Sequence, residues 1–518
     1  MRKKSHVLSC LSLIIILLFP SSVFAAHNGS SPFDPPEASD TTFVIDTAAK
    51  LDTYLFRSGG PIEFDIEVTR YVGEVDSEGY LINSGDLIID GVVSGTAKLR
   101  MPVWDVDYDL SGRTQLIADG VKPERDRIYF NGYDISPFYL QGDDNTWKQN
   151  EFTIPIDYVK FPARVTSPTG TPVPAKNRIT IYIDQDNIGN YIPKYGTSEF
   201  WAVAVDWAEL SLDAMPPLVL IHGNNSDGGF WDRRGFTQVL MNHHIPYNNS
   251  INLPTDTVTN NGATLANELM ATARRFGVQN IQIVAHSKGG LDTREFLDSH
   301  YPLLEQNKML SVNNFITLST PHRGSVGADY IRAVELTSNF RLNNPNALTK
   351  MASWLSGSYT QNQFNANLNL TTTWTAGFNV TNHLPSNIQY YSVGADADIN
   401  DNGTLERNEY QEMLDEAGHP NLWDSIANGP MNAMYQALGN FSSVTVRPTG
   451  QDSGWPFYTP IWEVVETPTS IFQENDMMVT INSASFNFSF IGQFSKNHAS
   501  VADGEVALSV IRFLKYAQ

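Results

Sequence analysis

A serine that could act as a nucleophile lies between a strand pattern and a helix pattern. Residues 281–286 read Ile-Gln-Ile-Val-Ala-His, Ser287 follows, and the chain continues through Lys288 and two glycines into a helix-like Leu-Asp-Thr-Arg-Glu-Phe-Leu. A sharp strand–turn–helix of this kind exposes the serine hydroxyl at its apex. The residues two before and two after the serine must be small, because neighbouring backbone crowds them, and here they are Ala285 and Gly289. The pattern predicts that Ser287 attacks a carbonyl carbon in acyl transfer.

Such a nucleophile needs hydrogen-bond donors for the oxyanion that develops during attack. Residues 217–224 read Pro-Leu-Val-Leu-Ile-His-Gly-Asn, a short apolar strand pattern that ends in a glycine turn. In this architecture the donors are the N–H of the residue after the nucleophile and an N–H from the loop of an earlier strand. We therefore expect the backbone N–H groups of Asn224 and Lys288 to form the oxyanion hole, with His222 in a structural role.

The order of the chain restricts the choice of a general base. Strand–turn–helix hydrolases carry their triad in the order Ser, then Asp or Glu, then His. The histidines after Ser287 are His300, His322, His383, His419 and His498. The first two lie too close to Ser287 to follow an acid, whereas His498 sits in a polar loop before an apolar helical pattern at 501–514. We predict His498 as the base, and His419 as a loop residue.

Three further segments resemble the secreted bacterial triacylglycerol lipases of the α/β-hydrolase superfamily. They are Asn314–Ser325 (NFITLSTPHRGS), Glu474–Val479 (ENDMMV) and Lys496–His498 (KNH). The resemblance covers roughly residues 215–515 and implies an α/β-hydrolase domain over 211–518 with a lid at about 327–383. It also implies Asp476 as the acid and His498 as the base. Asp396, which follows a strand-like stretch at 388–394, is the alternative acid.

Twelve residues, Asp398–Glu409, match the calcium-binding loop of an EF-hand. Oxygen-bearing residues occupy loop positions 1, 3, 5, 7, 9 and 12, glycine occupies position 6, and an apolar residue occupies position 8. The predicted ligands are Asp398, Asn400, Asn402, Thr404, Glu406 and Glu409. Because a strand pattern precedes the loop, we expect one structural calcium site rather than a paired sensor. In the lipases a carboxylate just after the catalytic histidine binds calcium, but here Ala499 and Ser500 follow His498.

Residues 26–210 show the sequence pattern of an all-β domain. Strand-like runs recur at Phe64–Tyr71, Arg127–Phe130, Glu151–Ile156, Arg178–Ile183 and Trp201–Leu210, with turn signals between them. Short strands with frequent turns predict a β-sandwich, and the segment around Trp104–Trp147 resembles Ig-like or jelly-roll modules of secreted bacterial hydrolases. An exposed aromatic such as Trp147 could stack on a sugar, so a polymer or glycan surface is a possible partner.

The N-terminal residues predict export from the cytoplasm. Residues 1–25 combine Arg2-Lys3-Lys4, an apolar run and a small-residue cleavage site, which predicts a cleavable signal peptide and secretion to the periplasm or medium. The one cysteine, Cys10, lies within this segment, so no disulfide or thiolate site is expected in the mature chain. A net charge of −22 disfavours nucleic-acid binding, and no second apolar stretch is long enough to span a membrane.

Together these patterns predict a secreted serine hydrolase that cleaves carboxylic esters through an acyl-enzyme, as a lipase or carboxylesterase. The same triad could serve a polyester depolymerase, an amidase or an acyltransferase, and a non-catalytic surface-binding protein is a further alternative. Calcium is the expected cofactor, and no organic cofactor is expected. The natural ester and its acyl-chain length are left open.

Overall fold

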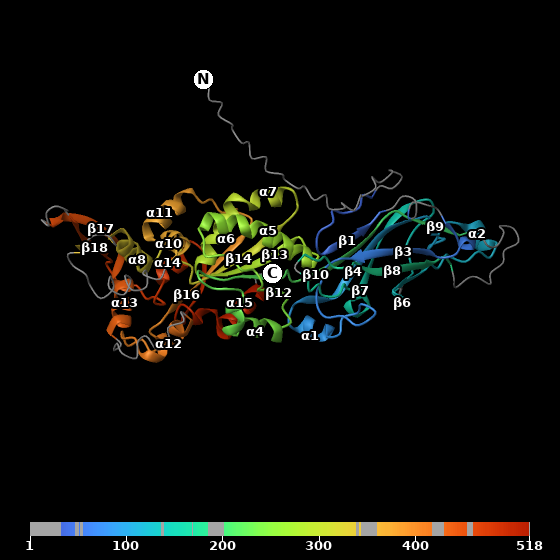
Figure 1. Ribbon diagram of the computed structural model, residues 1–518. Coiled ribbons are helices and arrows are strands. Elements are labelled where there is room, and N and C mark those ends of the chain that lie inside the picture. Colours follow the sequence, from blue (N-terminus) through green and yellow to red (C-terminus); the bar gives the residue numbers. More distant parts are fainter. Residues whose placement is uncertain are drawn as a thin grey trace, which may run out of the picture.

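The fold is taken from a computed structural model, which describes residues 33–46, 51, 55–135, 139–167, 169–184, 201–337, 341–342, 360–416, 429–452 and 459–516. The predicted signal peptide at 1–25 and the alternative His419 lie outside these residues. From one end to the other the molecule consists of a β-sandwich, a parallel sheet with helices on both sides, and a small β-hairpin unit (Figure 1).

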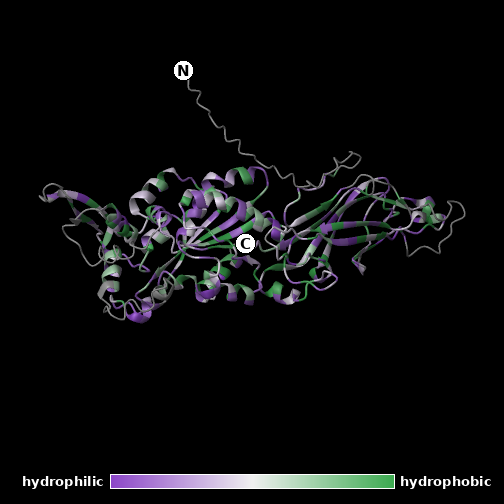
Figure 2. Cartoon of the chain, in the orientation of Figure 1, coloured by the Kyte–Doolittle hydropathy of each residue, from purple (hydrophilic) through white to green (hydrophobic). Residues whose placement is uncertain are grey.

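Alternating side chains build the two sheets of the sandwich. In β3 (Ile62–Val68) every second residue is buried, as expected of a strand with one face on the core. Figure 2 shows this interleaving of hydrophobic and hydrophilic residues along the sandwich strands. The larger sheet runs β1 (Thr42–Ile45), β10 (Ala208–Ala214), β4 (Val93–Trp104), β9 (Ala202–Val205) and β2 (Leu55–Phe56), with β7 (Trp147–Pro155) also paired to β4. The smaller sheet runs β3, β8 (Ala175–Tyr182), β5 (Arg127–Phe130) and β6 (Tyr133–Asp134).

All pairings within the sandwich are antiparallel. Two short helices, α1 (Ser84–Ile89) and α2 (Thr114–Ala118), interrupt the strands. The predicted strand at Arg127–Phe130 is confirmed with the same bounds, whereas the run predicted as Trp201–Leu210 is two strands, β9 and β10. The ring centres of Trp147 and Trp104 lie 5.6 Å apart, and binding of a sugar by Trp147 stays a prediction.

The central sheet is parallel and buried on both faces. Its order is β12 (Tyr247–Asn248), β11 (Leu218–Ile221), β13 (Asn280–His286), β14 (Ser311–Leu318), β16 (Gln389–Asp396) and β19 (Ser489–Ser495). Burial on both faces explains why β11 is apolar throughout rather than alternating. Leu218 and Leu220 pack on one apolar cluster and Val219 and Ile221 on another. The predicted α/β architecture with a mostly parallel sheet is present.

Helices cover this sheet on two sides. Figure 1 shows α5 (Val258–Phe276), α6 (Lys288–Ser299) and α7 (Tyr301–Gln306) on one side, and α4 (Phe236–Asn242) and α15 (Gly504–Tyr516) on the other. The short α3 (Phe230–Arg233) precedes α4, and α14 (Ile481–Ser485) precedes β19. None of the helices in the described part of the chain is both long and apolar enough to cross a membrane.

A shared core joins the sandwich to the sheet. One apolar cluster extends from Phe43 in β1 to Leu514 in α15. Arg70, 1% exposed, donates to the carbonyl oxygens of Ala214 and Met215 at 2.9 and 2.6 Å and to Asp40. These contacts fasten the loop after β3 to the connection between β10 and β11, where the chain enters the parallel sheet.

The region predicted as a lid contains α8 (Val326–Thr337), β15 (Arg341–Leu342), α10 (Gln361–Leu368) and α11 (Thr372–Thr381). Residues 338–340 and 343–359 of that region lie outside the described residues. Next to α8 packs a hairpin of β17 (Phe441–Asp452) and β18 (Thr459–Pro468), preceded by α13 (Gly429–Asn440). Sequence patterns did not predict this small sheet.

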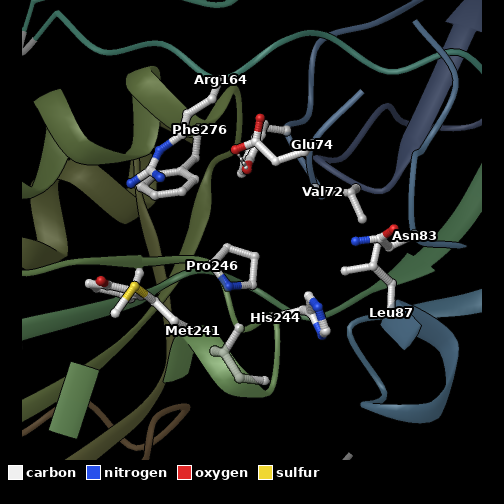
Figure 3. Close-up of a pocket in the computed structure, with 13 residues that line it drawn as sticks. Val72, Glu74, Asn83, Leu87, Arg164, Met241, His244, Pro246 and Phe276 are labelled. Carbon is white, nitrogen blue, oxygen red and sulfur yellow. Dashed lines mark hydrogen bonds between the residues drawn. The ribbon is translucent and has the colours of Figure 1, made fainter. Parts of the chain in front are cut away.

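A cavity of about 240 Å³ lies where the sandwich meets the unit built on the parallel sheet (Figure 3). Val72 and Leu87 line it from the sandwich, and Pro246 and Phe276 line it from the other side. None of the predicted catalytic residues lines this cavity. It is a gap between packed units, and the predicted chemistry lies elsewhere.

Candidate functional site

Ser287 stands at the turn between β13 and α6, in a backbone conformation that L-residues rarely adopt. Its φ is 54° and its ψ is −131°. Such a conformation costs about 1–3 kcal/mol and persists only where the surroundings impose it. A Cβ on Gly289 would lie 2.4 Å from the carbonyl oxygen of His222, and one on Gly290 would lie 2.1 Å from Thr320 Oγ1. The crowding predicted around the serine is therefore present, and it holds the turn.

The structure brings the three predicted triad residues into one hydrogen-bonded chain. Ser287 Oγ lies 2.8 Å from His498 Nε2, and His498 Nδ1 lies 2.8 Å from Asp476 Oδ2. A carboxylate oxygen can only accept, so Nδ1 carries the proton and Nε2 is left to accept from the serine hydroxyl. Ser287 directly follows β13, Asp476 lies in the loop before α14, and His498 lies in the loop before α15.

Asp476 is fixed in place by backbone donors. Its Oδ1 accepts from the N–H groups of Met478 and Val479 at 2.9 and 2.7 Å, and the residue is fully buried. The N–H of His498 donates to the carbonyl oxygen of Asp476 at 2.9 Å. Each of the two loops thus positions the other, which leaves Oδ2 directed at the imidazole.

The alternative acid, Asp396, has other partners. Its Oδ1 accepts from Tyr435 Oη at 2.9 Å and from the N–H of Asp398. Burial raises the pKa of Asp396 to about 6, against hydrogen bonds that lower it. His383, another histidine that chain order allows as a base, is exposed and lies two residues after the end of α11. Among the described residues, the geometry favours Asp476 and His498 over these alternatives.

The predicted oxyanion donors lie on either side of the serine. Lys288 is the first residue of α6, so its N–H has no carbonyl four residues earlier within the helix. Within the described part of the chain, the N–H of Asn224 makes no hydrogen bond. A Cβ on Gly223 would lie 2.8 Å from Ser287 Cβ and 3.3 Å from its Oγ. Only glycine lets the two loops approach this closely.

Sequence reasoning missed His286, which positions the base. Its Nε2 lies 2.8 Å from the carbonyl oxygen of His498, and its ring stacks on Phe230 at 4.6 Å. Burial lowers the pKa of His286 well below its ordinary value, with the charge of His498 adding to the effect. A neutral ring that donates from Nε2 therefore holds the backbone of the base. Its place next to Ser287 in the sequence was the available signal.

A buried ion pair lies under the elbow, and sequence reasoning also missed it. Lys288 Nζ lies 2.6 Å from Asp292 Oδ1, and Asn261 donates to Asp292 Oδ2 at 3.0 Å. Burial raises the pKa of Asp292, and Lys288 opposes that rise. The pair fixes the first turn of α6, which carries the N–H of Lys288, the second predicted oxyanion donor. Separately, His222 Nε2 accepts from the N–H of Leu253, consistent with its predicted structural role.

The segment 320–325 braces the loop of the acid. Ser325 Oγ donates to the carbonyl oxygen of Met478 at 2.6 Å, and Ser483 Oγ donates to that of Gly324 at 2.8 Å. His322 is buried and hydrogen-bonded to Thr317, so we assign it a structural role.

Helix α10 contacts the loop after β11, because Asn224 Nδ2 donates to Asn367 Oδ1 at 3.1 Å. The region predicted as a lid therefore contacts the loop after β11 through α10.

The predicted calcium loop lies between β16 and α12 (Arg407–Glu416), which begins at the tenth position of the loop. Gly403, at the sixth position, has a φ of +76°. Asp398 and Glu409 are 5% and 1% exposed. Both carboxylates accept from backbone N–H groups, and among the described residues neither forms an ion pair with a cationic side chain. Buried carboxylates without a cation nearby fit a metal loop.

Hydrogen bonds at both ends of this loop connect it to the loops that carry the predicted acid and the predicted base. The N–H of Ala397 donates to the carbonyl oxygen of Asn475 at 2.9 Å, one residue before Asp476. At the other end, Asn497 Nδ2 donates to the carbonyl oxygen of Glu409 at 2.9 Å, one residue before His498. Leu405 and Met477 share one apolar cluster.

Comparisons with known proteins give partial and distant likenesses. A family model described as a domain of unknown function (DUF7379) matches residues 180–416, which include Ser287 but end before Asp476. No curated protein matches the chain in sequence. Among solved structures, the mature lipase BlEst2 of Bacillus licheniformis is 20% identical, with a TM-score of 0.36 over 58% of this chain and 91% of its own.

Two further solved structures are similar over the same share of the chain. The metagenomic carboxyl esterase MGS0156 is 15% identical, with a TM-score of 0.34 over 58% of this chain and 76% of its own. EstA from Clostridium botulinum is 13% identical, with a TM-score of 0.33 over 58% of this chain and 87% of its own. The chain is thus similar, at low identity and over part of its length, to proteins named as lipases and esterases.

Proposed function

We propose that this protein is a serine hydrolase that cleaves carboxylic esters through an acyl-enzyme. The observation that carries the proposal is the hydrogen-bonded chain from Ser287 through His498 to Asp476, with both links at 2.8 Å. The motif resemblance to secreted lipases supports ester substrates, and residues 1–25 support action outside the cytoplasm.

The mechanism follows from the positions of the proton donors and acceptors. Ser287 Oγ attacks the ester carbonyl carbon while His498 Nε2 takes its proton, and Asp476 stabilises the imidazolium through Nδ1–H. The N–H groups of Asn224 and Lys288 bind the oxyanion. His498 then protonates the departing alcohol, and the acyl group stays on the serine. Water then attacks the acyl carbon while His498 takes its proton; the bond to Ser287 Oγ breaks, His498 returns that proton to Oγ, and the carboxylic acid is released.

We also propose that Asp398–Glu409 binds one structural calcium ion through Asp398, Asn400, Asn402, Thr404, Glu406 and Glu409. The support is the complete loop pattern and the burial of Asp398 and Glu409 without a cationic partner among the described residues. Calcium would supply the positive charge that lets these carboxylates stay ionised in the interior. The two hydrogen bonds from the loop ends would then hold the loops of the acid and the base in register.

Turnover of nitrophenyl esters by the purified protein tests the ester proposal. We expect hydrolysis that Ser287→Ala lowers by about 10³-fold or more, because the hydroxyl that forms the acyl-enzyme is gone. Ser299→Ala, an exposed position on the same helix, is the matched control and should keep wild-type rates. A series of esters from acetate to palmitate then separates esterase from lipase. Faster turnover of amides or of polyester films would favour those alternatives, and a folded protein inert to all of them would contradict the proposal.

A further inference from the structure

The loop after β11 carries a predicted oxyanion donor, the N–H of Asn224. Neighbouring residues of this loop are held by side-chain hydrogen bonds. His222 Nδ1 donates to the carbonyl oxygen of Gly223 at 2.8 Å, and Thr255 Oγ1 donates to Asn225 Oδ1 at 2.9 Å. Neither of these bonds holds Asn224 itself.

Among the described residues, the side chain of Asn224 forms its hydrogen bond with α10 alone. Asn224 Nδ2 donates to Asn367 Oδ1 at 3.1 Å, over a separation of 143 residues along the chain. Asn224 Oδ1 is buried and has no hydrogen-bond partner. Asn367 lies near the end of α10 and is 8% exposed. One bond between the two side chains therefore restrains Asn224.

The surroundings of Asn367 differ from those of an asparagine that only stabilises its own helix. Its Oδ1 accepts from Asn224, but its Nδ2 is buried and has no hydrogen-bond partner within the described part of the chain. A buried N–H without a partner is unfavourable, and an apolar side chain of similar size would avoid that penalty. Stability alone therefore does not account for asparagine at this position, whereas the bond to Asn224 does.

Hydrogen bonds on two sides hold the end of α10 in place. Asn369 Oδ1, directly after the helix, accepts from the N–H of Val258 at the start of α5 at 2.8 Å. The carbonyl oxygen of Leu370 accepts from the N–H of Ser325 at 2.8 Å. The helix also packs against α8 (Figure 1). The carboxamide of Asn367 is thus presented to the loop after β11 from an anchored helix end.

The backbone on either side of Asn224 makes such a restraint useful. Gly223 permits many backbone conformations because it lacks a Cβ, and Asn225 has a φ of 53°, in the left-handed region. A bond to the side chain of Asn224 reduces the freedom of this segment. Oxyanion donors act only when they are already in position, and a displacement of about 1 Å can cost about 10²-fold in rate.

We propose that Asn367 is a positioning residue for the oxyanion hole. Its hydrogen bond to Asn224 holds the Asn224 N–H where the oxyanion of the transition state develops. The inference rests on the proposed ester hydrolysis and adds a requirement to it: α10, from the region predicted as a lid, has to be docked on the loop after β11 for full activity. Because the bond does not involve the triad, its loss should slow the chemical step without changing how the rate depends on pH.

Kinetics of Asn367→Ala on a short-chain nitrophenyl ester test the proposal. We expect kcat/KM to fall by about 10-fold or more, mainly through kcat, because the Asn224 N–H loses its restraint. Complete loss of an oxyanion donor, about 10²–10³-fold, is the upper limit. The pH profile should keep its wild-type midpoint. Asn362→Ala, at an exposed asparagine of the same helix, is the matched control and should keep wild-type kinetics.

The variant Asn224→Ala removes the same hydrogen bond from the other side and keeps the backbone N–H. It should lower kcat/KM by a similar factor. Combining it with Asn367→Ala should cost no more than either substitution alone, because two residues joined by one bond do not contribute additively. The thermal midpoints of all three variants should stay close to that of the wild type, which shows that they fold.

Inhibition by a trifluoromethyl ketone separates positioning from a general loss of structure. Ser287 Oγ adds to the carbonyl carbon of this ketone, His498 takes the serine proton, and the carbonyl oxygen becomes an anion that needs the oxyanion hole. In Asn367→Ala the inhibition constant of the ketone should rise by the factor by which kcat/KM falls. The inhibition constant of the carboxylic acid product should not change.

Each outcome bears on either the inference or the proposed function. A wild type that cleaves no ester would overturn the proposed function and this inference with it. In an active wild-type background, unchanged kinetics in Asn367→Ala or additive losses in the double variant would overturn the inference alone. Equal weakening of both inhibitors would do the same, because it would indicate a structural role for Asn367.

Discussion

At the scale of single residues, the site depends on how closely two loops approach. The elbow and the loop after β11 meet at Gly223, where a Cβ would lie 2.8 Å from Ser287 Cβ. This approach brings Asn224, the residue after Gly223, close to Ser287. Misplacement of about 1 Å can cost about 10²-fold in rate, since near-attack geometry is lost.

Gly223→Ala should therefore lower kcat/KM for a short-chain ester by about 10²-fold, because the added methyl displaces the serine or the oxyanion donor. The thermal midpoint should change much less than the activity. Gly377→Ala is the matched control, since a Cβ there would meet nothing within 4 Å. Wild-type kinetics from Gly223→Ala would show that the close approach is not part of the mechanism.

Replacing each candidate acid, Asp476 or Asp396, with asparagine compares their roles directly. Asp476→Asn should lower kcat by about 10³–10⁴-fold, because an amide in this position favours the wrong imidazole tautomer. Asp396→Asn should lower it by much less, since Asp396 bonds to Tyr435 rather than to His498. Similar losses from both substitutions, measured under saturating ester, would remove the distinction between them.

The elbow pattern and the chain order predicted Ser287 and His498, the resemblance to the lipases implied Asp476, and the structure brings the three side chains into contact. The supports of the triad were not predictable in this way. His286 bonds to the backbone of His498, which lies 212 residues away along the chain. Such contacts depend on how the loops of separate strands meet, and no local pattern encodes that meeting.

At the scale of elements, the loop Asp398–Glu409 is a bridge between the acid and the base. The N–H of Ala397, directly before the loop, donates to the carbonyl oxygen of Asn475, and the carbonyl oxygen of Glu409 accepts from Asn497 Nδ2. Asn497 Oδ1 in turn accepts from the N–H groups of Ala499 and Ser500 at 3.0 and 2.9 Å. An ordered loop should therefore keep the imidazole of His498 within hydrogen-bond distance of Ser287 Oγ.

Removal of the proposed calcium ion should lower kcat more than it changes KM, because the loop contacts the loops of the proposed acid and base and not the substrate. Glu409→Gln should show a reduced kcat already and little further response to a chelator. Readdition of calcium should restore the wild type alone. A chelator effect on KM only, or an equal response of both proteins, would separate this loop from the catalytic loops.

Element boundaries were predictable where periodicity is uninterrupted. The strand at Arg127–Phe130 was placed correctly, and β11 differs from its prediction by one residue. β4 was missed because Gly95 and Pro102 break its pattern. β17 contains Pro448 and Gly450 at a register shift, so its sequence also reads as a loop. Pairing with β18 and packing on α8 override that local signal.

At the scale of the whole molecule, one apolar core spans the sandwich and the central sheet. Buried titratable groups within this body make its stability depend on pH. Burial and the charges of Arg294 and Arg323 lower the pKa of His322 well below its ordinary value. In the unfolded chain His322 binds a proton near pH 6.5, whereas in the folded chain the buried ring stays neutral at that pH. His322 therefore lowers the free energy of unfolding as the pH falls.

His322→Asn should flatten this dependence. Between about pH 6 and pH 5, the free energy of unfolding of the wild type should fall more steeply, by up to about 1.4 kcal/mol per pH unit, than that of the variant. His383→Asn, at an exposed position, should keep the wild-type slope. Denaturant titrations at each pH measure the slopes. Parallel curves for wild type and His322→Asn would mean that the buried ring takes up a proton in the folded state.

The central claim is that Ser287 forms a covalent acyl-enzyme with His498 as its base. Labelling with a fluorophosphonate, followed by mass spectrometry of peptides, tests it most directly because the reagent traps an activated serine. We expect one adduct per chain, on Ser287, lost in Ser287→Ala and strongly slowed in His498→Ala, with the exposed Ser299 unlabelled. A folded, ester-cleaving protein that carries its adduct on another residue, or no adduct at all, would contradict the account.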